Sequence, residues 1–269
     1  MLPGLKPENL PRATPEEIPV LRHSFPMPVT SLHQVEITSR CDLRCVYCCN
    51  PRMGRDPGFR GQQDMRPSHF ALALEHVAHY VRQGTQRELN LAGIGESTLH
   101  PGFPLFVDAA RLAVGPDVEL TLATNGVSLS KEDAWAESVA AALREFNVST
   151  YVSQHRPERA GLAVRFLVER GVRVCGASTD PALNAMDWAG QVEWRGLKQK
   201  AATPCQWLRQ GWAFALADGR VSPCCYDAQG KEPIGHVDDP VGSLKTRPYG
   251  LCRSCHQHIR VEEYEQRKG

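Results

Sequence analysis

Apolar and polar positions alternate in two rhythms along the middle of the chain. Short apolar runs bounded by turn residues predict β-strands, and longer runs with apolar residues at helical spacing predict α-helices. The predicted strands cover residues 33–38, 88–91, 118–123, 147–153 and 172–177. The predicted helices cover residues 67–83, 104–114, about 130–146 and 157–170. Alternating strands and helices are typical of right-handed βαβ units in a parallel sheet, either open and doubly wound or a partial barrel.

Boundary residues support three of these helices. Pro67 with Ser68 gives a helix start, and Gly171 gives a helix end. Ser130 and Asp133 have the spacing of a capping box, which predicts that the third helix begins at Ser130.

The two ends of the chain have a different character. Residues 1–32 are rich in proline and predict an extended lead-in. Beyond Pro181 the alternation stops, and two short apolar runs at 212–216 and 220–222 flank a turn, which predicts a hairpin. We therefore expect three parts: the lead-in at 1–32, an α/β core at 33–190, and a small β-containing appendage at 191–269.

Charge and composition exclude several classes of protein. The 269 residues include 31 Lys and Arg against 30 Asp and Glu, so the net charge of +1 gives no electrostatic signature of a nucleic-acid or membrane-surface binder. No apolar run reaches the roughly 18 residues that a membrane helix needs. The N-terminus carries prolines and charges rather than a signal-peptide pattern. We expect a cytoplasmic protein with neither nucleic acid nor membrane as a partner.

The ten cysteines change this picture most. In a reducing compartment, spaced cysteine clusters indicate metal or redox sites rather than disulfides. Four lie within residues 41–49 and five in the last quarter, which predicts two separate sites. Cys175 stands apart, either as a small buried hydrophobic residue or as a hydrogen-atom donor to a substrate radical.

The first cluster, Cys41, Cys45 and Cys48, has the spacing C-x3-C-x2-C directly after the first predicted strand. Three thiolates on one loop can bind three corners of an iron–sulfur cube, which leaves the fourth iron open to an amine and a carboxylate. A zinc site with Cys49 as fourth ligand is the alternative. Because neighbouring side chains such as those of Cys48 and Cys49 point apart, zinc would need a ligand from elsewhere.

A second, fully closed metal site can be built from the C-terminal cysteines. The available ligands are Cys205, Cys224, Cys225, Cys252 and Cys255. The C-x2-C spacing at the end of this set also fits a zinc knuckle, and His256 or His258 could replace one cysteine.

The sequence from Cys41 to Cys48, with Tyr47 just before the third cysteine, resembles the signature of the radical S-adenosylmethionine (radical SAM) superfamily. The resemblance implies a partial (β/α)6 barrel that holds a site-differentiated 4Fe–4S cluster. In that family the cluster reduces bound S-adenosylmethionine, releasing methionine and a 5′-deoxyadenosyl radical that abstracts a substrate hydrogen. Tyr47 would lie near the adenine.

Residues 91–101 are similar to the glycine–glutamate motif of the family, whose backbone and carboxylate hold the methionine ammonium. The resemblance assigns this role to Gly93, Gly95 and Glu96, with Ser97 where the family usually has proline. Glycines permit close backbone approach, and a carboxylate suits a cationic group.

Two further strand ends carry candidate cofactor contacts. Thr124 and Asn125, followed by Gly126, resemble a triplet that the family often has beside the cofactor, although Asn-Gly is also a common turn. Ser153 resembles a ribose-contacting position, a role that Gln154 could share. All these candidates follow predicted parallel strands, and α/β sheets and barrels build their sites at that edge.

The stretch 211–224 resembles the auxiliary-cluster extensions of radical SAM enzymes, known as SPASM and twitch domains. The single-cluster twitch form implies a second 4Fe–4S cluster on Cys205, Cys224, Cys252 and Cys255, with Cys225 as a possible substitute for Cys224.

These resemblances predict an oxidoreductase or epimerase that acts on a small polar substrate, such as a sugar or aminocyclitol of a natural-product pathway. It would use two 4Fe–4S clusters, S-adenosylmethionine and an external one-electron reductant of the flavodoxin or ferredoxin type. Modification of a peptide or protein side chain by the same chemistry is the second possibility. A non-catalytic iron–sulfur or zinc protein is the third, and it leaves the motifs at 93–97 and 124–126 without a role.

Overall fold

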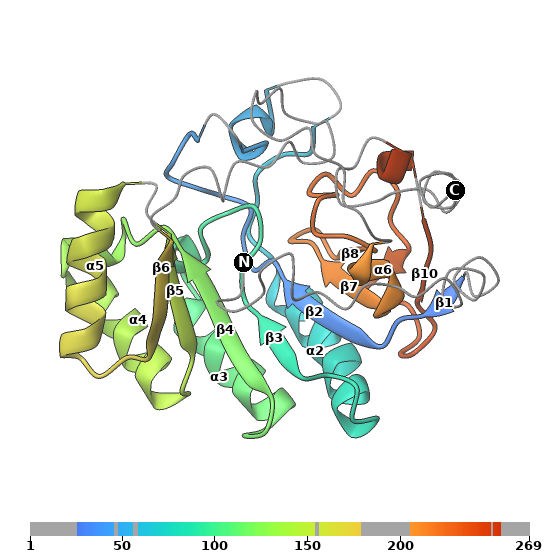
Figure 1. Cartoon of the computed structure of the whole chain (residues 1–269), viewed down its shortest axis with the longest axis horizontal. Helices are drawn as coiled ribbons and strands as arrows, with labels where there is room; N and C mark the ends of the chain where they lie inside the picture. Colours follow the sequence, from blue (N-terminus) through green and yellow to red (C-terminus); the bar gives the residue numbers. More distant parts are fainter. Residues whose placement is uncertain are drawn as a thin grey trace, which may run out of the picture.

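The computed structural model describes residues 26–45, 48–55, 59–153, 156–178, 205–248 and 250–253. Its centre is an eight-stranded sheet with the order β6-β5-β4-β3-β2-β7-β8-β9. Five strands pair in chain order, all parallel to their neighbours (Figure 1). They are β2 (Ser31–Val35), β3 (Glu88–Asn90), β4 (Glu119–Thr124), β5 (Ser149–Ser153) and β6 (Val174–Ser178).

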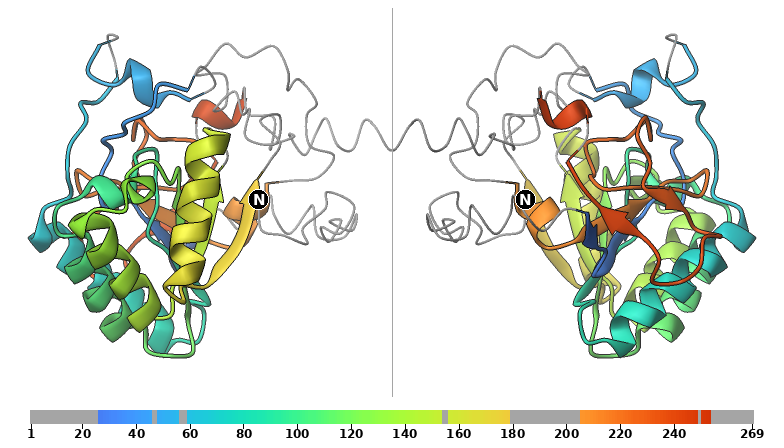
Figure 2. Two further views of the ribbon diagram at one scale, coloured as in Figure 1. Left: turned by 90° about the vertical axis from the view of Figure 1, so that its left-hand side faces the viewer. Right: turned by 90° about the vertical axis from the view of Figure 1, so that its right-hand side faces the viewer.

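Four long helices connect these strands: α2 (Pro67–Arg82), α3 (Phe103–Val114), α4 (Ala134–Glu145) and α5 (Pro157–Glu169). Each connection moves one strand further in the same direction, and parallel crossovers are right-handed. The helices therefore lie along one face of the sheet, as the side views of Figure 2 show. This arrangement confirms the predicted α/β class and its partial-barrel form. Among the described residues, no helix combines the length and the apolar character needed to span a membrane.

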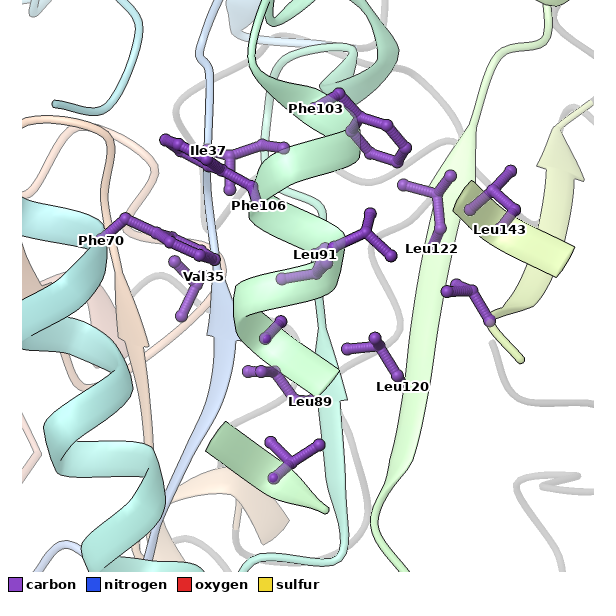
Figure 3. Packing of buried hydrophobic residues seen from close by; sticks show 14 of the residues in the cluster. Val35, Ile37, Phe70, Leu89, Leu91, Phe103, Phe106, Leu120, Leu122 and Leu143 are labelled. Atoms are coloured by element: carbon purple, nitrogen blue, oxygen red, sulfur yellow. The ribbon is translucent and has the colours of Figure 1, made fainter. Parts of the chain in front are cut away.

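The main core fills the space between the helices and the sheet (Figure 3). Leu89 and Leu120 alternate with polar neighbours along β3 and β4 and point towards the helices, as period-two patterning requires. Phe70 of α2 stacks on Phe106 of α3 with ring centroids 4.2 Å apart. Burial of each such side chain contributes roughly 1.5–3 kcal/mol.

The predicted hairpin is present and continues the same sheet. β7 (Trp212–Ala215) pairs in parallel with β2, and β8 (Arg220–Ser222) and β9 (Gly235–His236) follow in antiparallel order. At the turn, Gly219 has a φ of 89°, a conformation that favours glycine. The hydrogen-bonded sheet thus joins the predicted core to the predicted appendage.

Smaller elements complete the fold. β1 (Met27–Pro28) pairs with β10 (Lys245–Thr246), and the short helix α6 (Gln206–Arg209) precedes β7. In the described part of the chain, 3-10 turns lie in the loops at η2 (Asn50–Arg52), η3 (Ser97–Leu99), η4 (Leu129–Lys131) and η6 (Gly250–Arg253).

The predicted start of α4 was wrong. Glu132 adopts a left-handed conformation with φ 54°, which separates η4 from the helix. The Asp133 carboxylate, not the Ser130 hydroxyl, caps the helix by accepting a hydrogen bond of 2.9 Å from Ala136 N. Ser130 Oγ instead donates to Val127 O at 2.8 Å.

The first predicted strand also shifts. It was expected at 33–38, but β2 ends at Val35, and Thr38 forms an isolated bridge with Asp64 outside the sheet. The chain therefore leaves the sheet before the first cysteines and forms a long loop above its edge.

Candidate active site

The candidate site lies at the carboxyl edge of the parallel strands. The cysteine loop (residues 36–50) follows β2, the glycine loop (residues 91–98) follows β3, and residues 124–126 follow β4. Because parallel strands end at the same edge, these three segments approach one another. Hydrogen bonds between them, described below, fix that approach.

Three thiols of the cysteine loop are half-buried, and none forms a disulfide: Cys41, Cys45 and Cys48. A tight turn joins the last two, with Cys48 N donating to Cys45 O at 3.1 Å. Cys41 Sγ accepts a hydrogen bond of 3.5 Å from Leu43 N, and Cys48 Sγ accepts one of 3.4 Å from Asn50 N. Such N–H donors stabilise the negative charge that a metal-bound sulfur carries.

Burial governs the protonation of these thiols when no metal is present. It raises the pKa of Cys41 to about 12 and that of Cys48 to about 11, against the backbone hydrogen bonds that favour the thiolate. Both groups are then protonated at neutral pH, so neither is a free nucleophile. A metal ligand loses its proton on coordination, which is the role that this loop fits.

Cys49, the predicted fourth ligand of a zinc site, lies in an apolar environment. It is fully buried and packs in a small apolar cluster with Met53, Ile94 and Ala228. Across the described part of the chain, no three His, Cys, Asp or Glu side chains are arranged to hold a single metal ion. Zinc needs ligands that converge on one point, whereas an iron–sulfur cluster takes each thiolate on a separate iron. The burial of Cys49 in this apolar cluster argues against its use as the fourth ligand of a zinc site.

The cysteine loop and the glycine loop are hydrogen-bonded to each other. Glu96 N donates to Arg40 O at 2.7 Å. The Asn50 side-chain amide donates to Ser39 O at 2.7 Å and to Ile94 O at 3.1 Å. Asn50 was not among the predicted site residues, and its side chain holds the two loops at a fixed separation.

Both glycines of the predicted motif permit close contacts within the protein itself. A Cβ on Gly93 would lie 2.3 Å from Glu36 Cγ, and one on Gly95 would lie 2.2 Å from Thr38 O. Real Cβ contacts are never this short, so the glycine loop packs against the end of β2 only because these side chains are absent.

Glu96 is 2% exposed, and its carboxylate accepts four hydrogen bonds. Oε1 accepts from Thr98 N at 3.2 Å, Thr98 Oγ1 at 2.7 Å and Thr124 Oγ1 at 2.7 Å, and Oε2 accepts from Asn125 N at 2.6 Å. Burial raises the pKa of Glu96, and these hydrogen bonds oppose the rise. The carboxylate therefore joins the glycine loop to the end of β4.

Asn125 extends this network to the cysteines. Its side-chain amide donates to Asp42 Oδ1 at 2.8 Å and lies 3.8 Å from Cys41 Sγ. At the next strand end, Ser153 is half-buried and its Oγ donates to Thr124 O at 3.3 Å. Ser97 is fully buried, and its Oγ has no hydrogen-bond partner among the described residues.

A buried ion pair below the site was not predicted. Arg60 Nη2 contacts Glu36 Oε2 at 2.6 Å, and the same oxygen accepts from Ala217 N at 2.9 Å. Glu36 Oε1 accepts from Ile94 N at 3.1 Å, and Arg60 Nε donates to Ala228 O at 2.6 Å. No signal in the sequence indicates it, because Glu36 occupies an ordinary polar position between Val35 and Ile37 in an alternating segment.

Part of the predicted C-terminal ligand set can be placed. Cys205 and Cys224 are buried, and Cys225 and Cys252 are half-buried. Cys224 Sγ accepts a hydrogen bond of 3.4 Å from Tyr226 N.

The remaining candidates are one cysteine in β6 and five residues that the structure does not describe. Cys175 is half-buried in β6 rather than buried in the core. Five candidates lie outside the described residues: Tyr47, Gln154, Cys255, His256 and His258.

Two curated proteins are similar in sequence to part of this chain. The GTP 3′,8-cyclase of Caulobacter vibrioides is 36% identical over 138 residues, which cover 49% of this chain and 35% of that protein. The GTP 3′,8-cyclase 1 of Pseudomonas aeruginosa is 35% identical over 97 residues, covering 36% of this chain and 26% of that protein. The matches thus span about a third or less of the length of these curated relatives.

Among solved structures, BtrN in complex with AdoMet and 2-DOIA superposes with a TM-score of 0.62 at 20% sequence identity. The match covers 78% of this chain and 79% of that chain, so the two share a fold. An open conformation of BtrN gives a TM-score of 0.51.

The family assignment comes from a profile of the radical SAM superfamily, which matches residues 35–192. This match begins at the last residue of β2 and includes the cysteine loop, the glycine loop and β3–β6. The family implies a 4Fe–4S cluster and bound S-adenosylmethionine, for which the three thiols of the cysteine loop supply a suitable donor set. The chain belongs to the radical SAM superfamily.

Proposed function

We propose that the protein is a radical SAM enzyme that removes hydrogen from a small polar substrate, of the sugar or aminocyclitol class, and oxidises or epimerises it. One observation carries the proposal. The network Thr98–Glu96–Asn125–Cys41 joins three sequence motifs of the family at one edge of the sheet. This network supports the radical SAM part of the proposal, because the three motifs of the predicted cofactor site meet there.

The residues have the following proposed roles. Cys41, Cys45 and Cys48 hold the cluster and leave one iron for the amine and carboxylate of S-adenosylmethionine. The cofactor lies against the three loop ends and is contacted by Tyr47, Gly93, Gly95, Glu96, Ser97, Thr124, Asn125 and Ser153. Glu96 Oε2 accepts only one of the four hydrogen bonds, so this oxygen retains capacity for a cationic donor.

The C-terminal part would hold an auxiliary 4Fe–4S cluster on Cys205, Cys224, Cys252 and Cys255, with Cys225 as the substitute for Cys224. Support comes from the segment that follows Cys224. Ala228 packs in the same apolar cluster as Cys49, and Gln229 Oε1 accepts a hydrogen bond of 2.9 Å from Arg60 N. The C-terminal segment thus lies directly against the cysteine loop, a suitable arrangement for electron exchange.

When bound, the cluster on Cys41, Cys45 and Cys48 would supply the electron that cleaves S-adenosylmethionine, and the auxiliary cluster would take up the electron that the substrate radical loses on oxidation. In an alcohol oxidation, the substrate carbon gives one hydrogen atom to the 5′-deoxyadenosyl radical. The hydroxyl then gives a proton to solvent and one electron leaves, forming the ketone. Epimerisation instead requires that a thiol return a hydrogen atom, the role that Cys175 could fill. A flavodoxin- or ferredoxin-type protein would supply the reducing electron.

Metal analysis tests the two cluster sites together. The measurement is iron and acid-labile sulfide per chain after anaerobic reconstitution, with a Cys41→Ala/Cys45→Ala/Cys48→Ala variant as comparison. We expect about eight irons in the wild type and about four in the variant, since each cubane holds four. Four irons falling to none would remove the auxiliary cluster from the proposal, and a wild type without iron would overturn it entirely.

A second candidate is cyclisation of GTP, favoured by the 36% identity to a GTP 3′,8-cyclase over 138 residues. Release of 5′-deoxyadenosine from the reduced enzyme separates the candidates. We expect it to rise with sugars or aminocyclitols and not with GTP or with peptides. Stimulation by GTP alone would favour cyclisation, and stimulation by peptides alone would favour side-chain modification.

A further inference from the structure

The side-chain amide of Asn125 has one orientation that satisfies its surroundings. Its Oδ1 accepts a hydrogen bond of 2.9 Å from Val127 N. Its Nδ2 donates to Asp42 Oδ1 at 2.8 Å and to Cys41 Sγ at 3.8 Å. The reversed orientation would place two oxygens together at Asp42 and two N–H groups together at Val127, so the amide nitrogen faces the sulfur.

The backbone of Asn125 is held as firmly as its side chain. Its N–H donates to Glu96 Oε2 at 2.6 Å, and Glu96 is itself fixed by Thr98 and Thr124. Asn125 is 5% exposed, which shields its amide from competing water. The donor is therefore in place before any cofactor binds.

Cys41 consequently accepts two N–H groups, one from Leu43 and one from Asn125. Hydrogen bonds to cysteine sulfur raise the reduction potential of an iron–sulfur cluster because they stabilise the extra negative charge of the reduced state. The same amide also pairs with the Asp42 carboxylate, whose negative charge would otherwise disfavour reduction.

We propose that Asn125 is a positioning residue that raises the reduction potential of the cluster on Cys41, Cys45 and Cys48 by donating a hydrogen bond to Cys41 Sγ. The inference rests on the proposed cluster site. It gives Asn125 a role towards the cluster that differs from a direct contact with S-adenosylmethionine. Glu96 then acts through Asn125, since its carboxylate fixes the backbone that carries the donor.

The test compares wild type with Asn125→Leu in the reconstituted full-length protein. Leucine has the same number and branching of side-chain heavy atoms and no donor. The midpoint potential of the cluster on Cys41, Cys45 and Cys48 is measured by EPR-monitored redox titration without S-adenosylmethionine. The EPR signal of this cluster is identified as the one that changes when S-adenosylmethionine is added afterwards. We expect a lower midpoint with the iron content kept. Ser149→Ala is the matched control because it removes a hydrogen bond from the start of β5 to Glu119 at the start of β4, at the opposite end of these strands from Cys41, and its midpoint should equal that of the wild type.

Each outcome separates this inference from the proposed function. An unchanged midpoint in iron-loaded Asn125→Leu overturns the inference. Weaker binding of S-adenosylmethionine with that unchanged midpoint makes Asn125 a cofactor contact. No iron on Cys41, Cys45 and Cys48 in the wild type overturns the proposed function itself.

A second measurement needs no variant. The wild type is labelled with asparagine that carries 15N only in the side-chain amide, and the reduced cluster is studied by pulsed EPR. A coupling between the cluster and this 15N supports the bond to Cys41, because the Asn50 side-chain amide, the other labelled group that the described residues bring to this site, donates to two carbonyl oxygens. Absence of the coupling overturns the inference even if Asn125→Leu fails to fold.

Discussion

Glu36 and Arg60 form an ion pair of 2.6 Å in the interior, with side chains that are 1% and 7% exposed. The pair joins three parts of the chain. Glu36 lies just beyond β2 and accepts from the glycine loop at Ile94, and also from the C-terminal hairpin at Ala217. Arg60 follows the cysteine loop and donates to Ala228. One buried salt bridge thus connects both halves of the sheet with the segments around the site.

Removal of one partner should destabilise the protein strongly. Glu36→Gln keeps the shape of the side chain but leaves the Arg60 guanidinium buried without its counter-charge, which typically costs about 3–5 kcal/mol. The measurement is the free energy of unfolding in urea. The exposed pair Glu137–Arg170 is the matched control, and Glu137→Gln should change the stability little because water screens that pair. Equal effects of the two substitutions would contradict the connecting role of Glu36.

The contact of Gly95 with the cysteine loop predicts a second effect. In Gly95→Ala the new Cβ would lie 2.2 Å from Thr38 O and 2.7 Å from Arg40 O, both backbone atoms that cannot rotate away. We expect a loss of roughly 1–3 kcal/mol or more and reduced iron retention, because the loop that carries the cysteines must shift. The measurements are urea unfolding and iron per chain. Gly61→Ala is the control, since a Cβ there meets nothing within 4 Å; if it proved as damaging, close packing at Gly95 would not be the cause.

His33 predicts a pH dependence of stability. Its ring stacks on Trp212 with centroids 3.9 Å apart, and burial lowers its pKa from 6.5 to about 4. The unfolded chain takes up this proton near pH 6.5, whereas the folded protein resists it until about pH 4. Stability from this group is therefore complete above pH 6.5 and falls as the pH drops towards 4, by at most about 3 kcal/mol.

Comparison of the wild type with His33→Phe isolates that contribution, because phenylalanine keeps an aromatic ring on Trp212 and does not titrate. The measurement is the free energy of unfolding between pH 7 and pH 4. The free energy of unfolding of the wild type should fall relative to that of His33→Phe as the pH drops from 7 to 4. A constant difference would show that His33 does not titrate as its burial requires.

The cap of α4 gives a fourth prediction. Asp133→Ala removes the acceptor for Ala136 N and should cost about 1 kcal/mol, whereas Asp133→Asn should keep most of the stability because asparagine is an equally good N-cap. Thermal unfolding of both variants measures the effect. Equal losses in the two would indicate that charge rather than capping is responsible.

The sequence predicted the parallel sheet well because its signals are local. Apolar periodicity identified α2–α5 and the strands between them, and chain order alone then set their neighbours in the sheet. The start of α4 failed because the pattern at Ser130 and Asp133 fits two helix starts, and only the left-handed conformation of Glu132 decides between them.

Contacts between residues that are far apart in the sequence could not be predicted. Nothing in the pattern of residues 31–35 indicates pairing with residues 212–215, since strand pairing depends on three-dimensional packing. Asn125 was expected beside the cofactor from its motif, and its hydrogen bond to Cys41 appears only when the ends of β2 and β4 are placed together. Glu36 occupies an ordinary polar position of an alternating segment, and its partner Arg60 could not be identified from spacing.

The pairing of β2 with β7 also has a consequence for how the protein is made. A ribosome releases residues 31–35 long before residues 212–215, so the outer edge of β2 remains without its neighbour during most of synthesis. Unpaired strand edges are sites of aggregation. In the same interval Glu36 lacks the hydrogen bond from Ala217, and the cysteine loop lacks the contacts of Ala228. We therefore expect chains truncated before β7 to aggregate, and we expect iron delivery to follow completion of the chain rather than accompany its synthesis.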